Sequence, residues 1–416
     1  MLEELFPRVH RRYRSLPILG STLDAFATWL VQQGYPRWPV CQKIRTTRRI
    51  ERGLQERGVD QLRKVTRDGL RACAPTCSQD DRDLAGTIRS LTRYLDERGF
   101  FPAPDPPGRT ETKVGCYRTY LEEVRGLASW TVAHHLRTAS QFLKHLGYET
   151  QPVRVATLTP GDIESFVRAA GERLSRPSLQ HEVAHLRSFL RFLSTRGETP
   201  SGLDAQIDTP RVYRGERLPR ALPWETVRAF LDSIDRSTPM GLRDYAIFLL
   251  MATYGLRAGE IVALTLGDVE WRAGRIRVAQ RKTATPLLLP LTDAVGKVLL
   301  DYLRRGRPAL PNREIFLRCR APAGALQPTA VSEAFQGWSR RSGLAIPPQG
   351  PHCLRHSYAV RLLRQGISLK TIGDVLGHRS AESTCVYLRL AIDDLRSAAL
   401  PLPRESTSCA AGEVGS

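Results

Sequence analysis

Apolar residues recur at helical spacing through the middle of the chain. One set lies three or four positions apart and predicts a helix with one buried face: Val183, Leu186, Phe189, Leu190 and Leu193. An earlier set has related spacing: Leu136, Phe142, Leu143 and Leu146. These patterns predict a helical domain at residues 112–197.

Helical and strand patterns alternate over residues 218–402. Helices are predicted at 223–234, 242–253, 292–305, 329–342, 354–365, 368–376 and 392–399, and short strands at 275–278 and 287–289. Gly255 should end the second helix and place Arg257 at the mouth of a loop. The fold class is therefore mainly α, with an α+β domain that is mostly helical and contains a small β-hairpin.

Two stretches poor in periodic apolar residues divide the chain. Residues 101–112 are rich in proline, and residues 198–220 are polar and rich in arginine, so both are predicted linkers. The predicted domains span residues 1–104, 112–197 and 218–402. A tail at 403–416, rich in Ser, Gly and Ala, is predicted to be disordered.

Two segments of the N-terminal half resemble each other. Residues 88–99 and 186–197 are identical at six of twelve positions: Arg89/Arg187, Ser90/Ser188, Arg93/Arg191, Leu95/Leu193, Arg98/Arg196 and Gly99/Gly197. Residues 18–99 are therefore predicted to duplicate the helical domain at 113–197. The alternative is convergence of two amphipathic helices rich in Leu and Arg. A second copy could read further DNA sites, widen the footprint on DNA or contact another protomer.

The charge of the chain favours a polyanionic partner. The formal net charge is +20, from 62 basic and 42 acidic side chains, with a pI of about 10.1. The basic residues are spread along the chain, which predicts strong, salt-dependent binding to nucleic acid. The longest apolar run, at about 246–251, is too short to cross a bilayer, and the charged N-terminus lacks a signal-peptide core. We expect no membrane association.

The eight cysteines are scattered and complete no zinc motif. They are interpreted as reduced thiols of a cytoplasmic, nucleoid-associated protein without a metal or other cofactor. Cys353 and Cys385 flank the candidate chemistry described next, so modification of these thiols is expected to inhibit the protein.

Six side chains in the C-terminal part form a candidate set for attack on a phosphodiester: Arg257, Lys282, His352, Arg355, His378 and Tyr387. Arginine suits the charge that develops on phosphate oxygens, because it is planar, always protonated and able to bond two oxygens. A tyrosine hydroxyl, with a pKa of about 10, needs a base or cations nearby to become nucleophilic. The departing alkoxide needs a proton, which a partly desolvated lysine can supply.

Alternatives exist for single members of this set. His352 and His356 are four apart, as in a zinc-protease helix, but Cys353 stands where that motif needs a glutamate. His356 is therefore interpreted as a structural histidine of the helix. Lys282 has Arg281 beside it, so a solvated hairpin tip is the alternative to a catalytic role.

The set closely resembles the tyrosine recombinase (phage integrase) family over residues 112–400. The resemblance implies a SAM-like DNA-binding domain at 112–197 and a phosphate clamp made by Arg257 and Arg355. It further implies that Lys282 protonates the 5′ oxygen, that His352 supports acid–base chemistry and that His378 bonds the phosphate. Tyr387 would form a 3′-phosphotyrosyl link to DNA. Glu260 is expected to be a buried structural partner.

The same resemblance implies partners. Four protomers would act on two double-stranded DNA sites with inverted half-sites, and accessory DNA-bending proteins could assist. The arrangement resembles enzymes that integrate or excise mobile elements. Two alternatives are a topoisomerase-like relative that relaxes one duplex as a single protomer, and a DNA-binding regulator whose catalytic set is vestigial.

Overall fold

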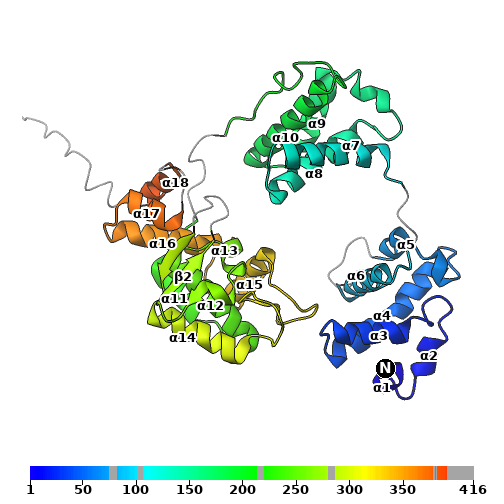
Figure 1. The fold of residues 1–416 in the computed structure, drawn as a ribbon, viewed down its shortest axis with the longest axis horizontal. Coiled ribbons are helices and arrows are strands. Elements are labelled where there is room, and N and C mark those ends of the chain that lie inside the picture. The colour runs from blue at the N-terminus through cyan, green and yellow to red at the C-terminus, as the bar shows by residue number, and fades with distance from the viewer. Residues whose placement is uncertain are drawn as a thin grey trace, which may run out of the picture. The chain divides into compact units, whose positions relative to one another are not determined.

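The computed structural model describes residues 1–74, 82–101, 106–212, 220–279, 286–377, 380 and 382–390, and helices dominate this part of the chain (Figure 1). The chain is divided into two compact units. One comprises Met1–Gln61, Cys73–Ile88 and Arg217–Ser416, and the other comprises Leu62–Ala72 and Arg89–Glu216. The boundary passes inside a helix, so the domain limits expected from the sequence stay predictions.

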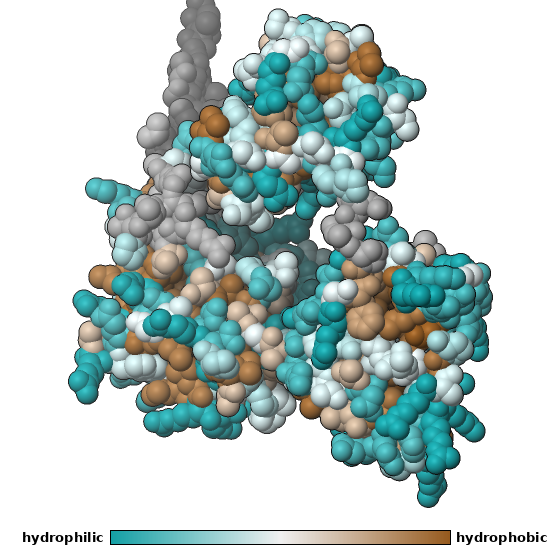
Figure 2. All heavy atoms as spheres, turned by 45° about the vertical axis from the view of Figure 1, so that its right-hand side comes forward, coloured by the Kyte–Doolittle hydropathy of each residue, from teal (hydrophilic) through white to brown (hydrophobic). Residues whose placement is uncertain are grey.

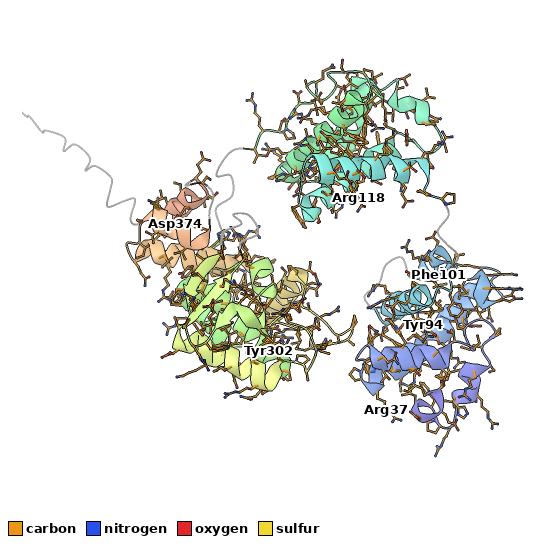
Figure 3. The ribbon with its side chains drawn as sticks, in the orientation of Figure 1. Arg37, Tyr94, Phe101, Arg118, Tyr302 and Asp374 are labelled. Carbon is orange, nitrogen blue, oxygen red and sulfur yellow. The ribbon has the colours of Figure 1, made fainter. Side chains whose placement is uncertain are left out.

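Short and long helices follow one another in the N-terminal segment. They are α1 (Leu2–Leu5), α2 (His10–Arg14), α3 (Leu23–Gln32), α4 (Arg37–Gln55), η1 (Leu62–Lys64), α5 (Arg67–Ala72) and α6 (Arg82–Glu97). Arg37 begins α4, and Tyr94 and Phe101 lie on and after α6 (Figure 3). The Arg67 guanidinium lies 4.8 Å from the centre of the Phe101 ring, which joins α5 to the end of this segment.

The central segment has α7 (Arg109–Thr119), η3 (Tyr120–Val124), α8 (Ser129–His145), η4 (Pro152–Val155), α9 (Pro160–Gly171) and α10 (Arg176–Thr195). Thr159 and Asp162 form a capping box that begins α9, which satisfies N–H groups left without partners inside the helix. Tyr117 is buried at the centre, where its hydroxyl donates to Ser188 Oγ at 2.9 Å. The apolar positions predicted for these helices line this core.

Partly buried histidines make this core sensitive to acid. Burial, and then the nearby His135, lowers the pKa of His185 from 6.5 to about 4. The folded chain therefore keeps this ring neutral where the unfolded chain protonates it. His185 is therefore expected to leave the free energy of unfolding unchanged above pH 6.5. It should lower this free energy as the pH drops from about 6.5 towards 4.

Thermal melting between pH 4 and pH 8 measures this loss. The variant His185→Gln should lose less stability over that window, whereas His145→Gln, which replaces an exposed histidine, should behave as the parent protein does. Equal slopes for His185→Gln and the parent would contradict the assignment.

The C-terminal segment combines helices with a small sheet. Its helices are α11 (Trp224–Asp232), α12 (Pro239–Tyr254), α13 (Ala258–Val262), η5 (Leu266–Asp268), α14 (Asp293–Asp301), η6 (Tyr302–Gly306), α15 (Pro328–Arg341), α16 (His352–Arg364), α17 (Leu369–Leu376), α18 (Glu382–Cys385) and η7 (Val386–Leu390). The strands β1 (Val269–Glu270), β2 (Arg275–Val278) and β3 (Leu287–Pro290) form an antiparallel sheet in that order. Ile276 pairs with Val269 on one side and Leu289 on the other.

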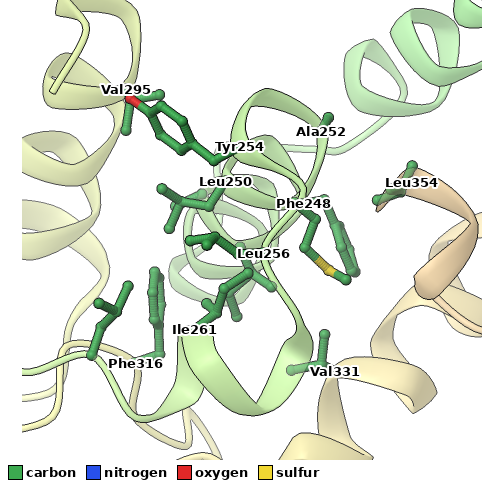
Figure 4. Packing of buried hydrophobic residues seen from close by; sticks show 14 of the residues in the cluster. Phe248, Leu250, Ala252, Tyr254, Leu256, Ile261, Val295, Phe316, Val331 and Leu354 are labelled. Atoms are coloured by element: carbon green, nitrogen blue, oxygen red, sulfur yellow. The ribbon is translucent and has the colours of Figure 1, made fainter. Parts of the chain in front are cut away.

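Helix α12 runs through the core of this segment. Phe248, Leu250 and Ala252 on α12 pack with Leu256, Ile261 and Leu354 from the elements around it (Figure 4). A polar group is buried beside them. Asp244 pairs with Arg243 at 2.7 Å and accepts from Trp338 Nε1 at 2.9 Å. Both oxygens of the Asp244 carboxylate thus have a hydrogen-bonding or charged partner, which burial of a charge requires.

Most predicted elements are confirmed, with shifts at their ends. Helix α12 begins at Pro239, earlier than predicted, because Thr238 accepts the N–H of Gly241 and caps the first turn. The predicted helix at 292–305 changes into a π-helical turn after Asp301. Helix α16 begins at His352 instead of 354, so His352 and Arg355 share its first turn. The predicted helix at 392–399 and the tail lie outside the described residues.

Among the residues that the structure describes, no helix combines the length and apolar character needed to cross a membrane.

Candidate active site

The site begins where α12 ends, at Gly255. This residue adopts a left-handed conformation with φ of 66°, which L side chains rarely adopt. A Cβ here would lie 2.6 Å from Leu376 Cδ2 and 2.8 Å from Tyr358 Cδ1. Glycine is therefore needed at position 255 for two reasons: the left-handed turn, and the close packing of α16 and α17 against this backbone.

Replacing Gly255 by alanine should be costly for both reasons. The left-handed backbone costs about 1–2 kcal/mol, and the crowded Cβ adds about 1–3 kcal/mol by overpacking. The matched control is Gly366→Ala, at φ of 78° with no atom within 4 Å of its added Cβ. Denaturant unfolding should show a clearly larger loss for Gly255→Ala, and equal losses would rule out the crowding.

Arg257 follows this turn and is fixed by Glu260. Its backbone N–H donates to Glu260 Oε2 and its Nη1 donates to Oε1, both at 2.8 Å. Glu260 is buried, whereas the Arg257 side chain keeps 31% of its surface exposed. The expectation that Glu260 is a buried structural partner is confirmed. The guanidinium is thus held in place while part of it stays accessible to a ligand.

Arg355 is held by the ends of two helices. It is 2% exposed, and its guanidinium donates to the carbonyls of Gly255 and Leu376, each at 2.5 Å. The carbonyl end of a helix is partially negative and stabilises a cation. Burial, and then the charge of Arg257, lowers the pKa of Arg355 to about 10. Arg355 therefore remains protonated at neutral pH and lies close enough to Arg257 for their charges to repel each other.

Tyr387 lies on η7 beside these cations. Its side chain is 2% exposed and packs with Ala359, Ile372 and Leu376. Burial raises the pKa of Tyr387, while the charges of Arg355 and Arg257 act to lower it. The phenol is thus protonated at neutral pH, yet near enough to both arginines to be stabilised as a phenolate.

His356 contacts the tyrosine hydroxyl. His356 Nδ1 lies 3.1 Å from the Tyr387 hydroxyl, and burial, with lesser effects of His352 and Arg355, lowers the pKa of His356 to about 4. A neutral ring can accept a proton at Nδ1 when Nε2 carries its hydrogen. The interpretation of His356 as only structural was therefore incomplete. Its position one helical turn after His352 could have indicated a shared face.

His352 is exposed on the first turn of α16, and its ring stacks edge-on against His356 with centroids 4.6 Å apart. The structure thus brings together Arg257, His352, Arg355 and Tyr387. Lys282 and His378 lie outside the described residues, so their assignments stay predictions. In the described part of the chain, no three His, Cys, Asp or Glu side chains are grouped so as to hold a metal ion.

The two cysteines near the site differ in exposure. Cys353 is buried, and burial raises its pKa to about 12, so this thiol should resist alkylation. Cys385 is exposed on α18, two residues before Tyr387. Iodoacetamide should therefore modify Cys385 and slow DNA cleavage by crowding the tyrosine.

The variant Cys385→Ser separates this effect from modification elsewhere. It should cleave normally and resist inhibition, whereas Cys116→Ser, which removes another exposed thiol, should stay sensitive. Unchanged cleavage after alkylation of the parent protein would reject the hypothesis.

Similarity to known proteins extends over most of the chain. Residues 220–393 match the phage integrase family, and residues 115–197 match the phage integrase N-terminal SAM-like domain. The putative integrase/recombinase y4rA of Sinorhizobium fredii is 33% identical over 390 residues, covering 92% of this chain and 94% of that protein. Tyrosine recombinase XerD of Listeria monocytogenes is 31% identical over 272 residues, covering 64% and 90%.

A solved structure supports the fold. XerH site-specific recombinase, bound to a palindromic difH substrate, matches with a TM-score of 0.55 at 18% identity, covering 78% of this chain and 97% of that one. The predicted fold class, mainly helical with a small sheet, is confirmed. The chain belongs to the phage integrase family and is a tyrosine recombinase, an enzyme that cleaves DNA and transfers its strands.

Proposed function

We propose that Tyr387 is the nucleophile of this recombinase. Its oxygen attacks the scissile phosphorus, a Tyr–O–P bond forms at the 3′ end, and the bond from phosphorus to the 5′ oxygen breaks. The observation that supports this role is the Tyr387 hydroxyl, held 3.1 Å from a neutral His356 and beside two arginines. The covalent link conserves the energy of the ester, so a 5′ hydroxyl of another strand can reverse the step without a further energy source.

Arg257 and Arg355 bind the non-bridging oxygens in this proposal. A guanidinium has five N–H donors, so the two that Arg355 directs to carbonyls leave others for phosphate. Donors fixed before the reaction are usually the largest contribution to catalysis. Because Glu260 and the two helix ends orient these arginines, little reorganisation is needed when phosphate arrives.

The remaining members of the set transfer protons or bind the phosphate in this proposal. The tyrosine proton passes to the paired imidazoles of His356 and His352, whose rings are in edge contact. Lys282 protonates the departing 5′ oxygen, and His378 bonds a phosphate oxygen. Since the Tyr387 side chain is 2% exposed, attack requires a shift of η7 that uncovers its hydroxyl.

The substrate we propose is double-stranded DNA with inverted half-sites. The charge of +20 suits a polyanion, and XerH, which shares this fold, was solved on a palindromic substrate. One protomer on each half-site of two duplexes makes a tetramer. Accessory DNA-bending proteins and a location at the nucleoid belong to the same proposal.

A nicked duplex that traps the covalent product tests this function. The DNA flanking the gene supplies the sequence, and a denaturing gel followed by peptide mass spectrometry locates the adduct. We expect a DNA–protein adduct on the peptide that contains Tyr387. An adduct on another residue contradicts the proposal, DNA binding without any adduct favours the regulator, and relaxation of a plasmid that lacks paired sites favours the topoisomerase-like alternative.

A further inference from the structure

Three consecutive residues hold the start of the C-terminal segment against the active-site helices. Arg220, Ala221 and Leu222 precede α11 and belong to no helix or strand. Each of them contacts a different part of the site: the loop that leads into α16, the cluster around Tyr387, or α16 itself. Residues 220–222 are called the entry segment below.

Leu222 is bound through its backbone by the hydroxyl of Ser357. Ser357 Oγ accepts the N–H of Leu222 at 2.7 Å and donates to the Leu222 carbonyl at 2.9 Å. The two residues lie 135 positions apart in the sequence. Because a hydroxyl is both donor and acceptor, one side chain pairs both backbone groups of Leu222. Backbone groups as buried as these are costly to leave unpaired.

Ser357 is a polar side chain inside the C-terminal segment. Hydrophilic side chains lie over much of the surface of this segment, the lower-left body in Figure 2. Serine is mostly found on such surfaces, whereas Ser357 is only 3% exposed. Buried polar groups are held by hydrogen bonds, and the pair with Leu222 supplies them here. The burial of Ser357 is thus explained by its hold on the entry segment.

Ser357 follows the active-site residues on α16. His352 begins the helix, and Arg355 and His356 directly precede Ser357. Successive residues of an α-helix are about 100° apart around its axis, so Ser357 faces another side of α16 than His356 does. The entry segment therefore holds α16 from a side other than the one on which His356 meets Tyr387.

The other two residues of the entry segment contact neighbouring parts of the site. Ala221 packs against the buried cluster that contains Tyr387. Arg220 Nη1 donates to the carbonyl of Pro348 at 2.9 Å, in the loop that precedes α16. The entry segment thus lies against both the helix of the proposed phosphate clamp and the cluster of the proposed nucleophile.

The chain before the entry segment is held by the central segment. Leu203 and Ile207 are buried in the core of that segment. Arg187 of α10 donates to the carbonyl of Asp204 at 3.2 Å and also to the carbonyl of Ile207. The connection between the central and C-terminal segments therefore has one fixed end on each of them, and its fixed end on the C-terminal segment is the entry segment.

We propose that Ser357 is a positioning residue of the cleavage reaction: by binding the entry segment, it keeps α16 and the cluster around Tyr387 in fixed relative positions. The inference rests on the proposed function of Arg355, His356 and Tyr387. Without the hydroxyl, the N–H and carbonyl of Leu222 turn towards water and the entry segment leaves α16. The reacting groups then occupy several arrangements, and misplacement by about 1 Å can slow a reaction about 10²-fold.

The first measurement compares the parent with Ser357→Ala in the full chain. The substrate is a nicked duplex that traps the covalent product, and the single-turnover rate of adduct formation is measured at saturating protein. We expect this rate to fall by about ten- to a hundredfold. Affinity for the same duplex, measured with Tyr387→Phe in both proteins, should change by less than about twofold, because Ser357 acts on the reacting groups and not on DNA contacts.

Two further variants separate positioning from loss of stability. Ser357→Thr keeps the hydroxyl and should retain most of the parent rate. Tyr302→Phe removes another buried hydroxyl of the C-terminal segment, which accepts the N–H of Leu317 at 3.2 Å. It should lower the free energy of unfolding, as Ser357→Ala does, yet cleave at nearly the parent rate. Denaturant unfolding measures both free energies, and circular dichroism checks that each variant is folded at the assay temperature.

Arg220→Gln tests the same segment without disturbing the core. Arg220 is exposed, so the substitution removes its bond to Pro348 while the buried contacts of the entry segment remain. The rate of adduct formation should fall severalfold, less than in Ser357→Ala. Arg304→Gln, which also removes an exposed arginine of the C-terminal segment, is the control and should leave the rate unchanged.

Two results would overturn the proposal: a rate for Ser357→Ala within about twofold of that for Tyr302→Phe, or equal losses of rate in Ser357→Thr and Ser357→Ala. The parent protein separates this inference from the proposed function. An adduct on a residue other than Tyr387 overturns both, whereas an adduct on Tyr387 that forms at the same rate in Ser357→Ala overturns the positioning role alone.

Discussion

Replacing Tyr387 by phenylalanine should abolish the covalent DNA adduct, with cleavage reduced by more than about 10⁴-fold, as for loss of other nucleophiles. The phenyl ring fills the same space among Ala359, Ile372 and Leu376 but lacks the attacking oxygen. The contact with His356 is lost from the fold, at a cost of about 1 kcal/mol. The variant should therefore still bind DNA. The measurement is adduct formation on a nicked duplex, resolved on a denaturing gel.

Tyr254→Phe is the matched control. Tyr254 is also buried, and its hydroxyl donates to Pro290 O at 2.6 Å and accepts from Thr292 N at 3.4 Å, so the substitution removes at least as many hydrogen bonds from a buried hydroxyl. This variant should retain the adduct. An adduct that persists in Tyr387→Phe would show that Tyr387 is not the nucleophile.

Replacing Arg257 by alanine should slow cleavage by about 10²–10³-fold, the cost of losing one preorganised donor to developing charge, or about 3–4 kcal/mol. The single-turnover rate at saturating protein separates this effect from weaker binding. Arg257→Lys should recover part of the loss, because an ammonium keeps the charge but not the bidentate geometry. Cleavage within a few-fold of the parent would contradict the proposed clamp.

Arg257 is a cleaner test than Arg355 for a structural reason. Arg355 is almost fully buried and its guanidinium bonds the carbonyls of Gly255 and Leu376, so its loss would leave buried acceptors without partners. Arg257 is partly exposed, although its removal leaves Glu260 Oε1 without its ion-pair partner. The double variant Arg257→Ala with Glu260→Gln controls for that freed carboxylate, and Arg305→Ala controls for loss of one exposed, ion-paired arginine.

The elements of the C-terminal segment followed from local patterns. Apolar spacing predicted α11, α15 and α17, and Gly255 was predicted to end a helix, which the structure confirms. These features depend on a few neighbouring residues, so periodicity and capping are sufficient to find them. The shift of the start of α12 to Pro239 depends on a cap hydrogen bond from Thr238.

Residue types and their order along the chain were enough to predict a candidate set that includes Arg257, His352 with Arg355, and Tyr387. Tertiary structure alone decided that His356 meets the tyrosine and that Arg355 is held by carbonyls 100 and 21 residues away. Such contacts depend on how helix ends pack together, which no local pattern encodes. Packing likewise decided that Trp38 and Trp130 both lie on the exposed face of a helix, since exposure depends on what the rest of the chain covers.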